Sequence, residues 1–386
     1  MHIALLTSDF LPNIGGMATH AHELAKALAC KDHEVHLVHP VYATGSDFVE
    51  QFDGIIVHRL FIANDTPRLK HLVYIRKVVS YLLKLHRDRK LDLIHWHDLT
   101  PNCWTTFRLR KEFPLVWTNH TSNYLEYCET KKGRLKIRAF LHHPDAIIGP
   151  SKELTEKSIH TGVPVNWLFY IPNGVDAEKF SPRVSSEEIA AQYGLDETKP
   201  IVICPRRLEP KNGVEYFVRA IPFVRKINPA AQFLIVGGGF PEERIRFENL
   251  LKERKEEHAV VFTGNVPNAT MPQFYAASDI AVLPSLMEAT SISGLESLSS
   301  GLPLIGTNIG GIPEIIAHEK TGILIEPRNP EQLAEQINRL LADEALRNRL
   351  GNAARKRIEE EFSWSVIAER TLEVYEKVIE KRNTRR

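Results

Sequence analysis

The stretch I-A-V-L-P-S-L-M-E-A-T-S-I-S-G-L-E-S-L-S-S-G, residues 280–301, decides how the chain is organised. Its first four residues form an apolar run of strand length, Pro284 ends that run, and residues 295–300 have the pattern of a short helix. This order of strand, loop and helix places Glu288 just past the carboxyl end of the strand and Glu296 in the first turns of the helix. Ligands bind at this edge of open α/β sheets, so we expect both carboxylates to face one crevice.

Two carboxylates at this edge suit a sugar nucleotide. A carboxylate can accept hydrogen bonds from two adjacent hydroxyls, as a sugar or a ribose presents them, and a helix amino terminus favours a phosphate. The spacing alone is weak, because about two such glutamate pairs are expected by chance in a chain of this length. The alternative is that both glutamates are simply solvated surface residues. The other segments of the chain must decide between this alternative and a nucleotide-sugar site.

Length and composition indicate two globular domains in a reducing compartment. The chain has 386 residues, too many for one ordinary core, and its net charge of +1 argues against nucleic-acid binding. Its four cysteines form no C-x-x-C pair, so neither a zinc site nor a disulfide framework is indicated. The sequence has no signal-peptide pattern and no apolar run of membrane-spanning length, so we expect a cytoplasmic protein.

Two adjacent glycines, Gly15 and Gly16, stand between the first apolar strand and the first helical pattern. Glycines there let backbone N–H groups approach an anion just before a helix amino terminus. The pair is not the G-x-G-x-x-G fingerprint, so a nicotinamide cofactor is not indicated. A simple turn is the more common meaning of a G-G pair.

Polar residues also end two later strands of the first half, over residues 91–98 and 114–123. Because the carboxyl ends of parallel strands meet at one edge, these side chains are expected to point into the crevice rather than the core. Histidines there could donate to a substrate oxygen or phosphate near neutral pH, although a structural hydrogen bond is an equally good explanation. The residues concerned are His95, His97, Asp98, Asn119 and His120.

The α/β pattern restarts after a charged stretch, residues 176–199, which we interpret as a linker. The loop after the next strand carries Arg206, Arg207 and Lys211, where cations can hold a diphosphate. Later strand ends supply further candidates for nucleotide contacts, namely Gly238, Asn265 and Val266.

A basic amphipathic helix is predicted over Arg68–Lys90, with Leu72, Ile75, Val79, Leu82 and Leu83 at helical spacing. One explanation is a solvated outer face on a helix that covers the sheet. The other is contact with an anionic membrane surface or an acidic acceptor. The stretch 130–143 is a second basic segment open to both explanations.

Together these elements resemble the retaining glycosyltransferases of family 4, whose α/β fold, GT-B, consists of two facing Rossmann-like domains with a central cleft. The resemblance covers nearly the whole chain and rests on G-G at 15–16, H-W-H-D at 95–98, T-N-H at 118–120, I-P-N-G-V-D at 171–176, the Arg-to-Lys loop at 206–211, the glycine turn at 237–239 and E-x7-E at 288–296. It implies an acceptor-binding domain at 1–175, the linker at 176–199, a nucleotide-sugar-binding domain at 200–363, and a helix at 364–386 that packs back on the first domain.

By this resemblance, Glu288 would face the hydroxyls of the transferred sugar and Glu296 would bind the ribose diol. Lys211, with either Arg206 or Arg207, would neutralise the departing diphosphate. Front-face attack without a protein nucleophile is the family expectation, and neither a cofactor nor a metal is expected, because the chain has no Asp-x-Asp triplet. The remaining implied positions are Gly15 and Gly16 over the phosphates, Gly238, Asn265, Val266, Thr290, Ser291 and Ile292 on the donor, His120 near the reacting sugar, and His97 with Asn119 on the acceptor side.

The resemblance leaves the substrates open. Where the family commonly has Glu-Gly-x-Gly-Leu, this chain reads E-A-T-S-I, so Ala289 and Ser291 replace both glycines. A hexose on UDP or GDP is the default donor, and a glycan or lipid-linked acceptor is suggested by the basic helices, which would place the protein at the inner membrane face. A catalytically silent nucleotide-sugar-binding protein and a nucleotide-sugar epimerase are the alternative functions.

Overall fold

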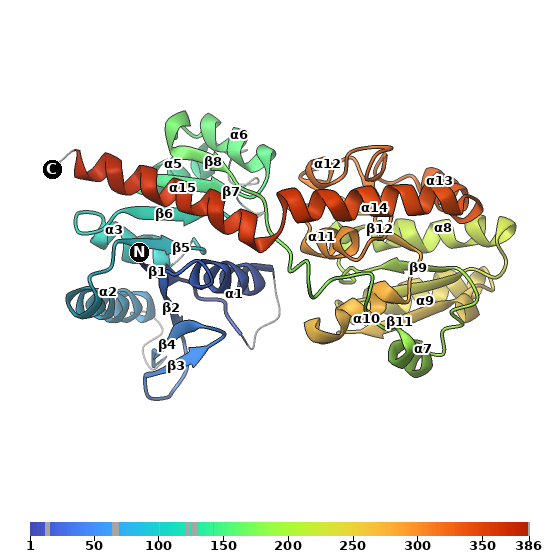
Figure 1. Ribbon diagram of the computed structural model, residues 1–386, viewed down its shortest axis with the longest axis horizontal. Coiled ribbons are helices and arrows are strands. Elements are labelled where there is room, and N and C mark those ends of the chain that lie inside the picture. The colour runs from blue at the N-terminus through green and yellow to red at the C-terminus, as the bar shows by residue number, and fades with distance from the viewer. Residues whose placement is uncertain are drawn as a thin grey trace. The chain divides into compact units, whose positions relative to one another are not determined.

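The computed structural model describes residues 1–11, 16–63, 69–99, 101–120, 124, 128, 130–141 and 143–384. The chain divides into two compact units, the first made of Met1–Gly174 with Trp364–Arg386 and the second of Val175–Ser363 (Figure 1). Each unit has its own parallel β-sheet.

The first unit is built on an eight-stranded sheet of order β3-β4-β2-β1-β5-β6-β7-β8, parallel throughout except for β3. Its strands are β1 (His2–Leu6), β2 (Glu34–Val41), β3 (Phe48–Phe52), β4 (Ile55–Phe61), β5 (Leu93–Trp96), β6 (Leu115–Thr118), β7 (Ala146–Gly149) and β8 (Leu168–Tyr170). Its helices are α1 (Gly16–Ala29), α2 (Lys70–Arg89), α3 (Asn102–Leu109), α5 (Lys131–Leu141), α6 (Lys152–His160), the 3₁₀ turn η1 (Val165–Trp167) and α15 (Trp364–Asn383).

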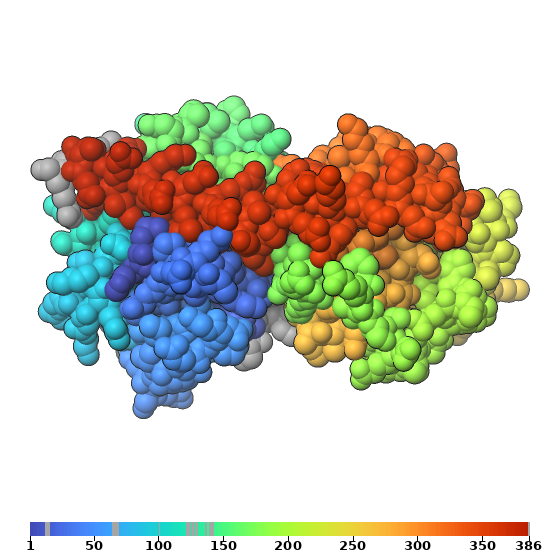
Figure 2. Space-filling model, viewed as in Figure 1, coloured from blue at the N-terminus to red at the C-terminus, as the bar shows by residue number. Residues whose placement is uncertain are grey.

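Helix α15 belongs to the first unit, although 189 residues of the second unit separate it from the rest in sequence, from 175 to 363. Its residues Ile367 and Tyr375 share a core with Leu5 of β1 and Leu24 of α1. Figure 2 shows the red carboxyl-terminal residues lying along this unit beside the blue residues of α1. Burying the apolar stripe of α15 on the sheet therefore completes the first core.

Two details of the first unit differ from the sequence prediction. Strand β3 was not predicted; it pairs antiparallel with β4 through Asp53 and Gly54, both at positive φ, as a tight hairpin turn requires. Helix α2 buries Tyr74, Val78, Leu82 and Leu85, whereas Leu72 and Leu83 of the predicted apolar stripe are exposed. Among the described residues, no helix has the length and apolarity needed to cross a bilayer.

The second unit is built on a six-stranded parallel sheet of order β11-β10-β9-β12-β13-β14. Its strands are β9 (Ile201–Cys204), β10 (Gln232–Val236), β11 (Val260–Gly264), β12 (Ile280–Leu283), β13 (Leu304–Thr307) and β14 (Gly322–Ile325). Its helices are α7 (Glu187–Tyr193), η2 (Pro210–Asn212), α8 (Val214–Ile227), α9 (Pro241–Glu253), η3 (Glu257–Ala259), η4 (Asn268–Thr270), α10 (Met271–Ala276), α11 (Ile292–Ser299), α12 (Ile312–Ile315), α13 (Pro330–Ala342) and α14 (Glu344–Glu361).

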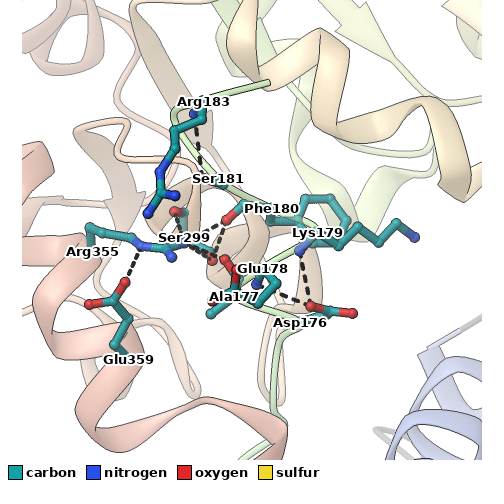
Figure 3. Close-up of polar contacts among 10 residues, drawn as sticks. All are labelled: Asp176, Ala177, Glu178, Lys179, Phe180, Ser181, Arg183, Ser299, Arg355 and Glu359. Carbon is teal, nitrogen blue, oxygen red and sulfur yellow. Dashed lines mark hydrogen bonds and ion pairs between the residues drawn. The ribbon is translucent and has the colours of Figure 1, made fainter. Parts of the chain in front are cut away.

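The segment 176–199 is packed into the second unit rather than forming a separate linker. Phe180 and Ile189 lie in its hydrophobic core. Figure 3 shows a second reason: one guanidinium nitrogen of Arg355, on α14, donates to the carbonyl oxygens of Ala177, Phe180 and Ser299, each at 2.7 Å. A charged donor satisfies three carbonyls at once and so anchors this segment beside the end of α11.

Candidate functional site

Loops at the carboxyl ends of β9, β12 and β13 contact one another through their backbones in the second unit. The N–H of Leu286 donates to the carbonyl oxygen of Lys211 at 2.8 Å, and the N–H of Gly311 donates to that of Glu288 at 3.2 Å. The motif 280–301 thus forms a strand, a loop and helix α11, which begins at Ile292 because Ser291 caps it by accepting from the N–H of Gly294. These contacts set the positions of the predicted donor-side residues.

Arg206 and Glu288 form an ion pair across two of these loops. The guanidinium also donates to Asn212 Oδ1 at 2.8 Å, and both ion-pair side chains are largely buried, at 12% and 15% exposure. Asn212 in turn donates to the carbonyl oxygen of Arg207 at 2.9 Å. The cation and the carboxylate predicted from separate motifs are therefore brought together and held in place.

Arg207 and Lys211 are more open to solvent, with 54% and 53% of their side chains exposed. Glu209 lies between them, 4.0 Å from Arg207 and 3.3 Å from Lys211. Exposed pairs of this kind are weak, so both cations can turn to an anionic ligand at little cost. The sequence left Arg206 and Arg207 as equal candidates, and the structure gives them different surroundings.

Glu296 is buried on α11, with 4% of the residue exposed. Its carboxylate accepts from the Tyr275 hydroxyl at 2.9 Å and from the Asn268 side chain at 3.3 Å. Burial raises the pKa of the Glu296 carboxyl from its ordinary value of 4.5 to about 7, although these hydrogen bonds act in the opposite direction. The carboxyl is thus close to half-ionised at neutral pH.

The other predicted donor contacts lie on the same edge of the sheet. The N–H of Gly238 donates to Asn265 Oδ1 at 3.0 Å, which joins the loops after β10 and β11. Thr290 is buried at the start of α11, and Val266 packs against the core of the second unit.

In the first unit, His97 and His120 follow β5 and β6 and contact each other, with His97 Nδ1 and His120 Nε2 3.1 Å apart. A third histidine, His20 of α1, packs against both, with its ring centroid 4.4 Å from that of His120 and 5.3 Å from that of His97. Sequence reasoning missed His20, because a histidine among alanines on an amphipathic helix gives no local signal. Gly16 is the first residue of α1, and Gly15 lies outside the described residues.

Burial lowers the pKa of all three rings. The pKa of His20 falls to about 4, and those of His97 and His120 fall well below the usual 6.5. All three are therefore neutral at physiological pH, each with one N–H and one lone pair. His120 can still donate one hydrogen bond, but not as an imidazolium.

Three of the strand-end polar residues, His95, Asp98 and Asn119, are buried. His95 is fully buried, 2.6 Å from the Tyr375 hydroxyl of α15 and 2.7 Å from Thr118 Oγ1. Asp98 accepts from the N–H of Ser8, and burial raises the pKa of its carboxyl to about 6. Asn119 is also buried, and its N–H donates to the carbonyl oxygen of Ile148. The side-chain contacts of His95 and Asp98 therefore stabilise the fold locally.

Comparison with known proteins places both units among sugar-transferring enzymes. Family models described as Glycosyltransferase Family 4 and Glycosyl transferases group 1 match residues 14–179 and 185–357. An uncharacterised glycosyltransferase of Methanocaldococcus jannaschii is 28% identical over 98% of this chain and 99% of its own length.

A GDP-mannose-dependent alpha-(1-6)-phosphatidylinositol monomannoside mannosyltransferase of Mycobacterium tuberculosis is 32% identical over 53% of this chain and 54% of its own length. The Anabaena protein HepE, solved in complex with UDP and glucose, superposes with a TM-score of 0.80 at 19% identity, over 98% of this chain and all of that one. The α/β fold of two Rossmann-like domains, predicted from the sequence, is confirmed.

Proposed function

Because this chain belongs to glycosyltransferase family 4, the group 1 glycosyltransferases, we propose that it transfers a hexose from a UDP- or GDP-linked donor to a glycan or lipid-linked acceptor with retention of configuration. The HepE complex with UDP and glucose and the GDP-mannose dependence of the mycobacterial relative support a nucleotide-sugar donor of one of these two kinds. The mycobacterial relative's phosphatidylinositol-based substrate supports a lipid-linked acceptor.

The observation that carries the proposal is the joined arrangement of Arg206, Lys211 and Glu288 at one sheet edge. The loop with both cations is hydrogen-bonded to the loop that delivers the carboxylate. Glu288 would accept from hydroxyls of the transferred sugar while the cations stabilise the negative charge that develops on the diphosphate. We propose that this stabilisation needs no divalent metal at the diphosphate, and that His120 lies near the reacting sugar.

The first test is a thermal-shift screen with UDP-glucose, UDP-N-acetylglucosamine, GDP-mannose, UDP and GDP. A ligand that binds only the native state raises the melting temperature by mass action, and at one hundred times its Kd it adds about 2.7 kcal/mol. We expect one nucleotide series to stabilise the protein and the Glu296→Gln variant to lose most of that shift. If no nucleotide raises the melting temperature at millimolar concentration, the proposed donor site is wrong.

The raised pKa of Glu296 predicts that nucleotide binding depends on pH. A ribose diol donates more strongly to an ionised carboxylate, so the nucleotide-induced shift of the parent should grow from pH 6 to pH 8 as Glu296 ionises around its pKa of about 7. Without nucleotide, the raised pKa means that the folded state binds the proton more tightly than the unfolded state, so this group's contribution to stability is lost as pH rises from about 4.5 to about 7. Glu296→Gln should remove both trends, and a parallel pH response in parent and variant would contradict the assignment.

We also propose that the face formed by α2 and α3 contacts an anionic membrane surface. Leu72 and Val73 of α2 and Trp104 of α3 are exposed, and α2 packs against α3. Exposed apolar side chains beside cations have the composition of an interfacial helix, and each cation near such a surface contributes about 1 kcal/mol. The cations of α2 are Lys70, Arg76, Lys77, Lys84, Arg87 and Arg89.

Sedimentation with vesicles tests this surface. The parent should bind vesicles containing phosphatidylglycerol and not pure phosphatidylcholine, and the triple variant Arg76→Glu, Lys84→Glu and Arg87→Glu should reduce binding more than tenfold. The control carries the same charge reversal on exposed residues of the second unit, Lys252→Glu, Arg254→Glu and Lys356→Glu. Equal losses in both triple variants would show that only net charge matters, which would reject a docking face.

A further inference from the structure

Three histidines converge inside the first unit from three separate elements. His20 lies on α1, His97 follows β5 and His120 follows β6. One ring nitrogen of each lies within 4.8 Å of those of the other two, and no other histidine, cysteine or carboxylate group of this kind occurs among the described residues. Sugar transfer as proposed above assigns at most a donated hydrogen bond to one of them.

Hydrogen bonds determine which nitrogen of His20 is available. Its Nδ1 lies 2.9 Å from Asn173 Oδ1, which can only accept, so Nδ1 carries the hydrogen and the neutral ring presents its lone pair at Nε2. That Nε2 is buried and has no hydrogen-bond partner. The amide thus orients the ring as an outer partner does for a metal-binding histidine.

His97 also has one engaged and one unpartnered ring nitrogen. Its Nδ1 is engaged with His120 Nε2, and its own Nε2 is buried without a hydrogen-bond partner. When His97 donates from Nδ1, a second buried lone pair results. Leaving a buried polar atom without a partner is unfavourable, so two such nitrogens on histidines of one cluster favour a ligand that accepts lone pairs.

We propose that His20, His97 and His120 form a binding site for a late first-row divalent transition metal, with Zn²⁺ as the reference ion. Neutral imidazole nitrogens suit Zn²⁺, Co²⁺, Ni²⁺ and Cu²⁺, and three histidines leave a fourth position open. The site lies in the first unit, whereas the cations assigned to the diphosphate lie in the second, so metal-free leaving-group stabilisation and this site are separate properties.

Metal binding requires the three ring nitrogens to move closer together. Zn–N distances of about 2.0–2.1 Å place the nitrogens of a tetrahedral site about 3.3 Å apart, which is closer than the 4.8 Å limit within which these three lie. Trp364 of α15 contacts His20 edge-on, with the two ring centroids 5.2 Å apart. The Trp364 ring also packs closely on Gly174, where an added Cβ would lie 2.6 Å from it. Asn173, next to Gly174, is therefore fixed beside His20.

Titration of tag-free, chelator-treated full-length protein with Co²⁺, followed by visible absorbance, tests the proposal, with Zn²⁺ added in competition. We expect one equivalent of Co²⁺ to give absorption bands of a nitrogen-ligated ion and Zn²⁺ to displace it. His20→Ala and His120→Gln should each weaken binding more than tenfold, and Asn173→Ala should weaken it about 10–100-fold through the orientation of His20.

His22→Ala is the matched control, because His22 lies on the same helix but points to Asp53, with Nε2 3.0 Å from the carboxylate. This variant should keep the full Co²⁺ signal. Circular dichroism and the nucleotide-induced thermal shift of the second unit show whether each variant is folded, so loss of metal binding is separable from failure of the donor site. Absence of a stoichiometric Co²⁺ signal in the folded parent, or equal loss in His22→Ala, would overturn the proposal.

Discussion

Arg206→Met should lower the turnover number about 10²–10³-fold, whereas Arg207→Met should leave most of it. Removing one preorganised group that stabilises developing charge typically has an effect of this size. Arg206 is held by Glu288 and Asn212 and is largely buried, so its position is set before a donor binds. Arg207 is exposed and 4.0 Å from Glu209, so solvent screens its charge more strongly.

The assay is steady-state transfer from the donor identified by thermal shift, and methionine keeps an unbranched side-chain stem while removing the charge. If Arg206 acts mainly on the leaving diphosphate, kcat falls and KM changes little, because the charge develops in the transition state. Lys211→Met should also lower kcat, because the backbone of Lys211 is hydrogen-bonded to the loop that carries Glu288, which fixes the start of its side chain beside the site. A larger loss in Arg207→Met than in Arg206→Met would reverse the assignment.

Much of the fold could be predicted from strand-length apolar runs followed by turns and helices. The run at 280–283 is strand β12, and the prediction that Glu288 and Glu296 follow it on a loop and a helix holds because Ser291 caps α11. The pairing of Glu288 with Arg206 could not be predicted, since it depends on how the loops after β9 and β12 contact each other. The order of strands in the sheet makes β9 and β12 neighbours, and this order cannot be predicted from the local sequence pattern.

The errors of the sequence prediction have physical causes that particular residues show. Strand β3 has exposed apolar residues such as Val49 and no clear alternation, yet the Asp53–Gly54 pair was a hairpin signal that could have revealed it. Polar residues at strand ends were all assigned to the crevice, but His95 lies within β5 and has its partners inside the core. The partner Tyr375 is 280 residues away in the sequence, and hydrophobic periodicity predicts no contact over that separation.

Gly213→Ala should destabilise the second unit by several kcal/mol and abolish donor binding. Gly213 ends the cation loop at a φ of +65°, and an added Cβ would lie 1.9 Å from the carbonyl oxygen of Pro284. That oxygen belongs to the backbone, so no side-chain rotation can relieve the overlap, and the two loops would have to separate. Separation would break the bond from the N–H of Leu286 to Lys211 that aligns the cations with Glu288.

Gly194→Ala distinguishes this clash from backbone strain alone. Gly194 ends α7 in the same unit at a φ of +64°, but nothing lies within 4 Å of an added Cβ. Its replacement should cost only the left-handed penalty of about 1–2 kcal/mol, measured as a shift of the urea midpoint, and should leave nucleotide binding intact. Both variants place alanine at a similar positive φ, so both pay the same backbone strain. The difference between their urea midpoints therefore measures the clash between the two loops. Equal midpoints would mean that the loops move apart freely, and the joined arrangement of cations and carboxylate could not then be the preorganised site on which the proposed transfer depends.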